Sequence, residues 1–313
     1  MVSEPRDRET RSGDDGLGLV RRLTPPPLLL CVQVAVLLAM ALVVVTSFWK
    51  DHPWFGWALV AAAAAAWAPE FRLRRMRLWW FGYVAGIFVY TLLRSYADET
   101  LIPVRRDYVI EADRFLFFGA DPVEWIQGSL FSTSRITAID VAAVLVHWSF
   151  FIAPHAAAVI IFLKRRELFA RYAFVVVATM YLGLALFFLV PTAPPWLAAQ
   201  EGSLNGVYRV MDFVGGRVNA DTYRSLYASL GEPNSVAAMP SIHMGVTFAM
   251  FLWSRAHHRP SAWPLLAYTG IMGLALVYLG EHYVLDLAAG IICAAVSYLA
   301  ANRLLPAEPQ AAR

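Results

Sequence analysis

Hydrophobic residues in this chain occur in long runs, which alternate with short polar segments. A helix needs about 20 mostly apolar residues to cross a bilayer, and backbone in lipid must satisfy its hydrogen bonds internally. The pattern therefore predicts an all-α, polytopic transmembrane helical bundle of about eight spans. The predicted spans cover residues 28–49, 54–69, 78–94, 136–163, 172–191, 241–253, 263–280 and 287–304. The second and the sixth are short, which is compatible with tilted or re-entrant segments.

The composition supports a membrane domain, because 59% of the 313 residues are hydrophobic and only 16% are charged. A water-soluble domain contains fewer hydrophobic and more charged residues. This domain is predicted at residues 28–305. It is flanked by a tail of residues 1–27, whose composition favours disorder, and by a short tail of residues 306–313. Cys31 and Cys293 both fall inside apolar runs, which argues against a disulfide or a metal cluster. The net charge of +3 is not arranged as a basic face, so nucleic acid is not an expected partner.

Positive charge predicts the sides of the membrane, since short cytoplasmic loops carry an excess of lysine and arginine. With eight spans, the basic clusters fall on one side, and both termini are then cytoplasmic. These clusters contain Arg21 and Arg22, Arg72, Arg74, Arg75 and Arg77, Lys164, Arg165, Arg166 and Arg171, Arg255 and Arg259, and Arg303. The long connections 95–135 and 192–240 then face the exterior, and the amphipathic stretch 115–130 is expected along the outer interface. We expect a multi-pass protein of the plasma membrane.

Three ionisable residues stand at helix ends that this topology places on the exterior side. His243 follows Pro240 and Ser241 at the start of the sixth span, and His282 and Asp286 precede the eighth. Ionisable groups near hydrocarbon are costly and mark functional sites. His282 and Asp286 are four positions apart and share a face of a helix. The carboxylate can then accept a proton from one ring nitrogen while the other stays free.

Transfer of a phosphoryl group is the chemistry that suits these residues. An oriented imidazole such as that of His282 can attack phosphorus and form a phosphohistidine, while His243 protonates the leaving oxygen. Pro240 and Ser241 suit the first turn of a helix. The free N–H groups and the dipole of such a turn favour a bound phosphate, so Ser241 is a predicted substrate-binding residue.

The same residues resemble the motifs of a known family. Pro-Ser-x-His at 240–243, followed by His-x3-Asp-x2-Ala-Gly at 282–290, is similar to the second and third signature motifs of the PAP2 (phosphatidic acid phosphatase type 2) family. Val-Pro-Thr-Ala-Pro-Pro-Trp at 190–196 resembles the branch that contains inositol phosphorylceramide synthases. The resemblance covers about residues 94–304. It implies a six-helix catalytic core that is preceded by N-terminal spans.

The resemblance also implies a role for each residue of the predicted site. His282 would be the nucleophile, Asp286 its orienting partner, and His243 the general acid and later the general base. No metal ion and no cofactor are implied. The phosphate-binding elements of the family are missing, because Lys-x6-Arg-Pro is absent and Ala275 and Leu276 replace a Ser-Arg pair.

Two arginines are candidates for the missing phosphate-binding charge. Arg94 stands at the outer end of the third predicted span, where its planar guanidinium is placed to grip a phosphate. Arg114 lies in the first exterior connection beside Asp113 and Glu111, and it is the weaker candidate because such an arginine can simply be solvated or paired.

Two further histidines, His147 and His155, occur in the fourth predicted span. Each is interpreted as a histidine that bonds to a neighbouring helix, although Asp140 and His147 share a helical face and could line the cavity. They are therefore not included among the catalytic candidates.

The preferred function is a membrane enzyme that transfers a phospho-headgroup, for example an inositol phosphate, between lipids at the exterior face. The alternative is a phosphatase for a lipid phosphate or a prenyl diphosphate, and the second alternative is a non-enzymatic lipid-binding or transport protein. The expected partners are a phospholipid or polyprenyl phosphate substrate and the membrane lipids. The sequence leaves the oligomeric state open.

Overall fold

The computed structural model describes residues 74–94, 96, 101–229 and 236–305, with a few helical residues between 33 and 41. The chain divides into a unit of residues Met1–Arg72 and a unit of residues Leu73–Arg313. Helices α5 to α15 all belong to the second unit. The predicted tails and nearly all of the first two predicted spans lie outside the described residues.

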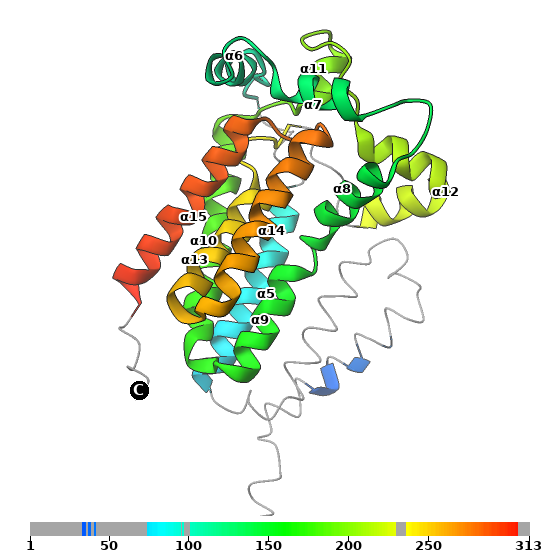
Figure 1. Cartoon of the computed structure of the whole chain (residues 1–313). Coiled ribbons are helices and arrows are strands. Elements are labelled where there is room, and N and C mark those ends of the chain that lie inside the picture. Colours follow the sequence, from blue (N-terminus) through cyan, green and yellow to red (C-terminus); the bar gives the residue numbers. More distant parts are fainter. Residues whose placement is uncertain are drawn as a thin grey trace, which may run out of the picture. The chain divides into compact units, whose positions relative to one another are not determined.

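The second unit is built around a bundle of helices (Figure 1). The bundle contains α5 (Arg74–Arg94), α8 (Ala138–Ser149), α9 (Ala153–Lys164), α10 (Arg166–Leu189), α13 (Ile242–His257), α14 (Arg259–Tyr278) and α15 (Val284–Leu304). The remaining helices of this unit are α6 (Asp107–Leu116), α7 (Pro122–Leu130), α11 (Pro195–Gln200) and α12 (Val210–Ser229). Helix α12 is interrupted at Asn219, which leaves helical geometry. Since the described residues contain no β-strand, the predicted all-α class is confirmed.

Several of these helices are suited to a membrane. Among the described residues, α10, α14 and α15 are each long and apolar enough to cross it, and α8 with α9 would add a fourth span if counted together. Helix α5 contains a shorter apolar helix, Leu78–Arg94. These findings support a membrane protein, whereas the predicted number of about eight spans is not confirmed.

The predicted span 136–163 is divided into two helices that are bent by 43°. Helix α8 ends before Phe150, and α9 begins after Ile152, in a turn where each backbone N–H donates to the carbonyl three residues back. Pro154 explains the break, because it has no N–H to donate and its ring would collide with the carbonyl of Phe150 in a continuous helix. The hydrophobicity pattern alone does not predict this bend, because the segments on both sides of it are apolar.

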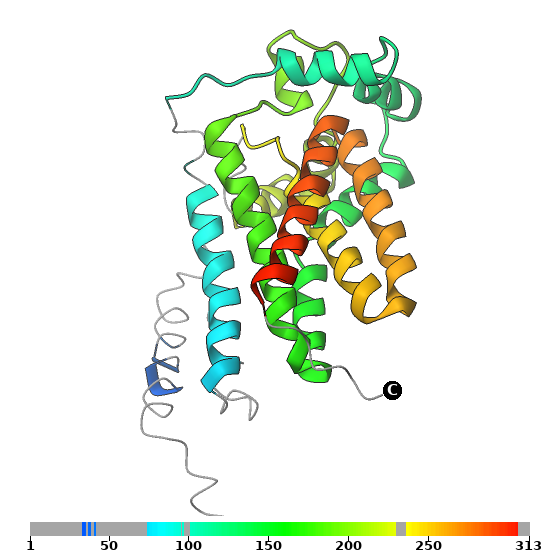
Figure 2. The same cartoon turned by 90° about the vertical axis from the view of Figure 1, so that its left-hand side faces the viewer.

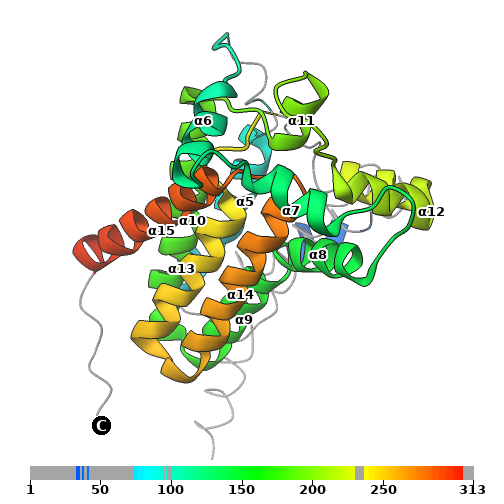
Figure 3. The ribbon, with the colours of Figure 1, turned by 45° about the horizontal axis from the view of Figure 1, so that its top comes forward.

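The helix ends that carry the predicted site lie at one end of the bundle, here called the loop end, where α6, α7 and α11 also lie. Figures 1 and 2 show that α5 and α10 finish there and that α13 and α15 begin there. Figure 3, which looks toward this end, shows α6, α7 and α11 over it and α12 to one side, next to α8. The α9–α10 and α13–α14 connections lie at the opposite end. The described parts of the two predicted exterior connections thus share one end of the bundle.

The predicted interfacial stretch 115–130 forms the last turn of α6 and all of α7 instead of one helix. Phe118 and Gly119 make the turn between them, both with positive φ, of 56° and 94°. The side chains of Phe115 and Phe118 are strongly exposed, as is that of Trp125. Exposed aromatic residues at the loop end are what a surface in contact with the membrane interface requires.

Helices α13 and α15 approach each other backbone to backbone. A Cβ atom added at Gly290 would lie 2.2 Å from the carbonyl oxygen of Ser241, and one added at Gly245 would lie 2.9 Å from the carbonyl oxygen of Gly290. The N–H of Ser241 donates to the carbonyl of Asp286 at 2.9 Å. Only glycine permits so close a crossing, which explains the glycine that ends the His-x3-Asp-x2-Ala-Gly motif.

Gly290→Ala should therefore lower the stability of the protein by about 1–3 kcal/mol, as overpacking does in other cores. Gly270→Ala is the matched control, because Gly270 is an exposed residue of α14 and an added Cβ would meet nothing within 4 Å. Its stability should stay equal or rise by up to about 1 kcal/mol, since alanine favours a helix. Thermal unfolding of both purified variants in detergent measures the difference, and equal melting temperatures would contradict the close crossing.

Candidate active site

His282 and Asp286 lie where α14 turns into α15. Gly280 adopts a positive φ of 75° in this turn, and His282 precedes Tyr283, the N-cap residue of α15. Oδ2 of Asp286 accepts the N–H of Tyr283 at 2.9 Å and lies 3.3 Å from Nδ1 of His282. Both side chains are buried, that of Asp286 completely. The carboxylate thus orients the imidazole through Nδ1 and leaves Nε2 of His282 outside this contact.

His243 is the second residue of α13. Ser241 is the N-cap of this helix, as predicted, and its buried hydroxyl accepts the N–H of Met244 at 3.3 Å. The ring centroids of His243 and His282 are 5.9 Å apart. Nε2 of His243 is buried and has no hydrogen-bond partner within the described part of the chain. The two motifs, which are far apart in the sequence, therefore meet at the loop end.

A carboxylate from outside the bundle caps α15. Asp113, on α6, is fully buried, and its two oxygens accept the N–H groups of Val284 and Leu285 at 2.8 and 2.9 Å. Negative charge at a helix N-terminus is stabilising. Burial raises the pKa of Asp113 to about 6, although the two N–H donors act in the opposite direction. The sequence placed Asp113 in a polar loop, and this contact was not predicted.

The two predicted cations have different surroundings. Arg94, the last residue of α5, acts electrostatically on His243. Arg114 acts on Asp121, whose pKa is raised by burial and lowered by this arginine. The electrostatic neighbours of His243 include Arg94 and do not include Arg114. Of the two arginines, Arg94 is therefore the one that acts on a candidate catalytic histidine.

Another arginine, Arg209, was missed by sequence reasoning. Its Nε donates to Oε1 of Glu281 at 2.8 Å, and its guanidinium lies 4.5 Å from the centroid of the Trp196 ring. Glu281 directly precedes His282, so Arg209 is tied to the turn that carries the candidate nucleophile. Arg209 and Glu281 are 72 positions apart, and no spacing rule would have paired them.

His147, near the end of α8, packs against His243. The ring centroids of the two histidines are 4.5 Å apart, and those of Phe150 and Phe151 lie 4.3 and 6.1 Å from that of His243. Only 5% of His147 is exposed, and its Nδ1 has no hydrogen-bond partner among the described residues. The interpretation of His147 as a histidine bonded to a neighbouring helix is therefore not supported at this nitrogen.

The same interpretation is confirmed for the second histidine of that predicted span. Nδ1 of His155, on α9, lies 2.9 Å from the hydroxyl oxygen of Tyr83, on α5. Asp140, which was expected on the face of α8 that could line a cavity, is fully buried. It accepts hydrogen bonds from the hydroxyl of Tyr278 and from the N–H of Thr137, so its contacts are those of a structural residue.

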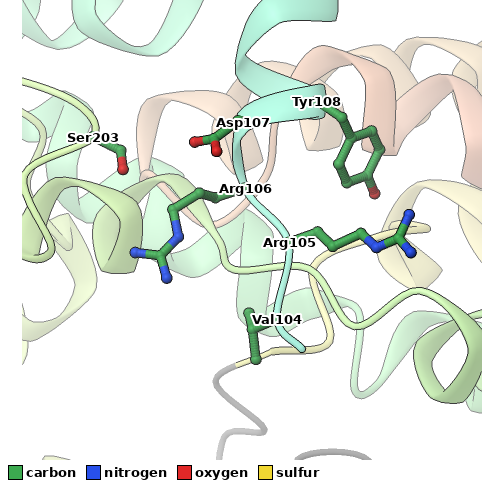
Figure 4. A pocket seen from close by; sticks show the side chains of 6 residues that line it. All are labelled: Val104, Arg105, Arg106, Asp107, Tyr108 and Ser203. Carbon is green, nitrogen blue, oxygen red and sulfur yellow. The ribbon is translucent and has the colours of Figure 1, made fainter. Parts of the chain in front are cut away.

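A polar pocket of about 570 Å³ opens at the loop end (Figure 4). It is lined by Val104, Arg105, Arg106, Asp107, Tyr108 and Ser203. Figure 4 shows Arg105 and Tyr108 on one side and Arg106 on the other, where Arg106 pairs with Glu201. The hydroxyl of Tyr108 bonds to Thr192 at 2.7 Å and to the sulfur of Met239 at 3.0 Å. The pocket therefore borders the segment that leads into His243.

The sequence of this chain is similar to a known family and to a known protein. The family model described as the PAP2 superfamily matches residues 107–300. A Bacteroides thetaiotaomicron protein named phosphoinositol dihydroceramide synthase is 28% identical over 150 residues, which cover 44% of this chain and 47% of that protein. The chain thus spans about half the length of this curated relative. No solved structure matches the chain.

Proposed function

Because the chain belongs to the PAP2 superfamily, we propose that it is an integral membrane enzyme that transfers a phospho-headgroup between lipids. The main observation that supports this proposal is the buried His282–Asp286 pair, which lies beside His243 at the loop end of the bundle. An inositol phosphate is the proposed headgroup, since the name of the Bacteroides relative contains phosphoinositol. The phospholipid donor and the lipid alcohol that accepts the headgroup would both reach this end from the bilayer.

The proposed reaction has two steps at phosphorus. Nε2 of His282 attacks, the bond to the leaving lipid oxygen breaks, and that oxygen takes a proton from His243. The acceptor alcohol then gives a proton to His243 and attacks the phosphohistidine, which restores His282. Asp286 would hold the ring of His282 and stabilise its positive charge. The amides at the start of α13, which Ser241 caps, would bind the phosphate oxygens.

Hydrolysis is the second candidate, because water can replace the alcohol without any change in these groups. The polar pocket favours this possibility, since Tyr108 lines it and contacts Met239 in the segment before His243, so water in the pocket would be near the candidate site. A phosphatase for a lipid phosphate or a prenyl diphosphate would then result.

One assay separates these possibilities. Purified protein is offered phosphatidylinositol with a lipid alcohol, and in separate reactions phosphatidic acid or a prenyl diphosphate. A transferred headgroup supports the proposal, and release of inorganic phosphate from the other two lipids supports the phosphatase. Absence of both products with every lipid would overturn both enzyme candidates and favour a lipid-binding or transport protein.

The site residues should differ in how strongly their loss affects turnover. His282→Ala should reduce it to background because the nucleophile is gone, and His243→Ala should lower it by about 10² to 10⁴. Asp286→Asn should be the mildest, since the nucleophile and one acceptor oxygen remain. Rates are measured on variants that keep the wild-type melting temperature. A wild-type rate in His282→Ala would rule out the covalent route.

Arg94 is proposed to supply the charge that the absent Lys-x6-Arg-Pro element would otherwise provide. Arg94→Ala should lower turnover by about 10² to 10³, the effect of removing one donor to a developing oxyanion. Arg94→Lys should restore part of it, because lysine keeps the charge without the planar fork. Arg165→Ala, at an exposed position between α9 and α10, is the control and should retain full activity. An unchanged rate in Arg94→Ala would mean that Arg94 only reaches toward the interface.

We further propose that the loop end faces the cell exterior and that both termini are cytoplasmic. A cysteine at Gly216, an exposed residue of α12 whose added Cβ meets nothing within 4 Å, should react with an impermeant thiol reagent in intact cells. A cysteine at Arg165 should react only after the cells are opened. The parent chain, which contains Cys31 and Cys293, supplies the background. The reverse pattern would move the candidate site to the cytoplasm.

A further inference from the structure

We propose that His147 is a third histidine of the active site, which binds the reacting hydroxyl oxygen of the lipid alcohol together with His243. The inference rests on the proposed function and deepens it, because it assigns a binding residue to the lipid alcohols of the reaction. One alcohol leaves in the first step, and another accepts the headgroup in the second. His147 would hold this oxygen by a hydrogen bond, while the proton transfer itself remains with His243.

The first support is geometric. The imidazole of His147 lies against that of His243, with 4.5 Å between their centroids and 37° between their planes. His243 in turn is 5.9 Å from His282. The ring of His243 therefore lies next to both of the other rings, which come from α8 and from the turn before α15. A group that bonds to the edges of the His147 and His243 rings would be next to the candidate general acid.

The second support is the unpartnered nitrogen of His147. A buried polar atom without a hydrogen bond is destabilising, and most such atoms in native proteins have a partner. Within the described residues, Nδ1 of His147 and Nε2 of His243 are both buried and lack one. His155 has its partner in Tyr83, so the bundle does satisfy a histidine that serves its structure. Two neighbouring imidazoles with unmet hydrogen-bonding capacity fit a ligand that supplies an oxygen to both.

The third support is the electrostatic environment. His147 interacts with His282, Arg209 and Arg94, which stand in three different parts of the fold. The same arginine, Arg94, acts on His243. The positive charge of the two arginines thus acts on this part of the site, which suits an oxygen that carries negative charge while its bond to phosphorus breaks or forms.

The test compares two substitutions of His147. His147→Phe keeps a ring and removes both nitrogens, so the buried unpartnered atom disappears and the melting temperature should stay equal or rise. The rate of headgroup transfer should nevertheless fall about tenfold or more, the effect of one lost hydrogen bond in the reaction. His147→Asn places an amide where Nδ1 was and should recover part of that loss. The KM for the lipid alcohol should rise more in the phenylalanine variant than in the asparagine variant.

His155→Phe is the matched control. It removes the partner of the Tyr83 hydroxyl, so its melting temperature should fall while the turnover of the folded protein stays unchanged. A purely structural role of His147 predicts this same result for His147→Phe, with a lower melting temperature and a normal KM, and would overturn the inference.

Binding of the alcohol is measured separately, so that this inference and the proposed function can fail independently. Diacylglycerol in mixed micelles should raise the melting temperature of the wild-type protein, and this shift should be lost in His147→Phe and kept in His155→Phe. Absence of transfer in the wild-type protein would refute the proposed function alone. An equal shift in wild type and His147→Phe, or no shift in either, would refute the role of His147 whether or not transfer occurs.

Discussion

The backbone contact between α13 and α15 determines where the candidate chemistry can occur. A Cβ atom at Gly290 would lie 2.2 Å from the carbonyl oxygen of Ser241, and the N–H of Ser241 reaches the carbonyl of Asp286. Backbone atoms, and not flexible side chains, therefore set the separation of the helix starts that carry His243 and His282. Because a bulky residue at this crossing would spread the helices, Gly290 at the end of the His-x3-Asp-x2-Ala-Gly motif serves the geometry of the site.

The cost of polar groups in an apolar bundle is the second constraint, and the residues meet it in different ways. Asp286 accepts the N–H of Tyr283 and faces Nδ1 of His282, while Asp113 accepts two N–H groups at the start of α15. Both oxygens of Asp113 and Oδ2 of Asp286 thus have partners in the folded chain. Among the described residues, Oδ1 of Asp286 and Nδ1 of His147 are buried and lack a partner, so unmet hydrogen-bonding capacity gathers at the candidate site.

The sequence predicts what depends on neighbours along the chain and fails where packing brings distant segments together. The helical class, the cap at Ser241 and the His282–Asp286 pair follow from apolar runs and short spacings. The contact of Arg209 with Glu281, 72 positions away, has no local signal. His147 was placed on the correct kind of element, but helical periodicity gives only the face of a residue and does not identify the helix that covers this face.

The break between α8 and α9 connects a feature of the local sequence with the packing of distant segments. Pro154 prevents one continuous helix through residues 136–163, and the resulting turn holds Phe150 and Phe151, whose rings lie 4.3 and 6.1 Å from that of His243. The turn residues thus place two aromatic rings against the candidate general acid. The same turn follows His147 directly, so the bend also sets how α8 presents this histidine to the site.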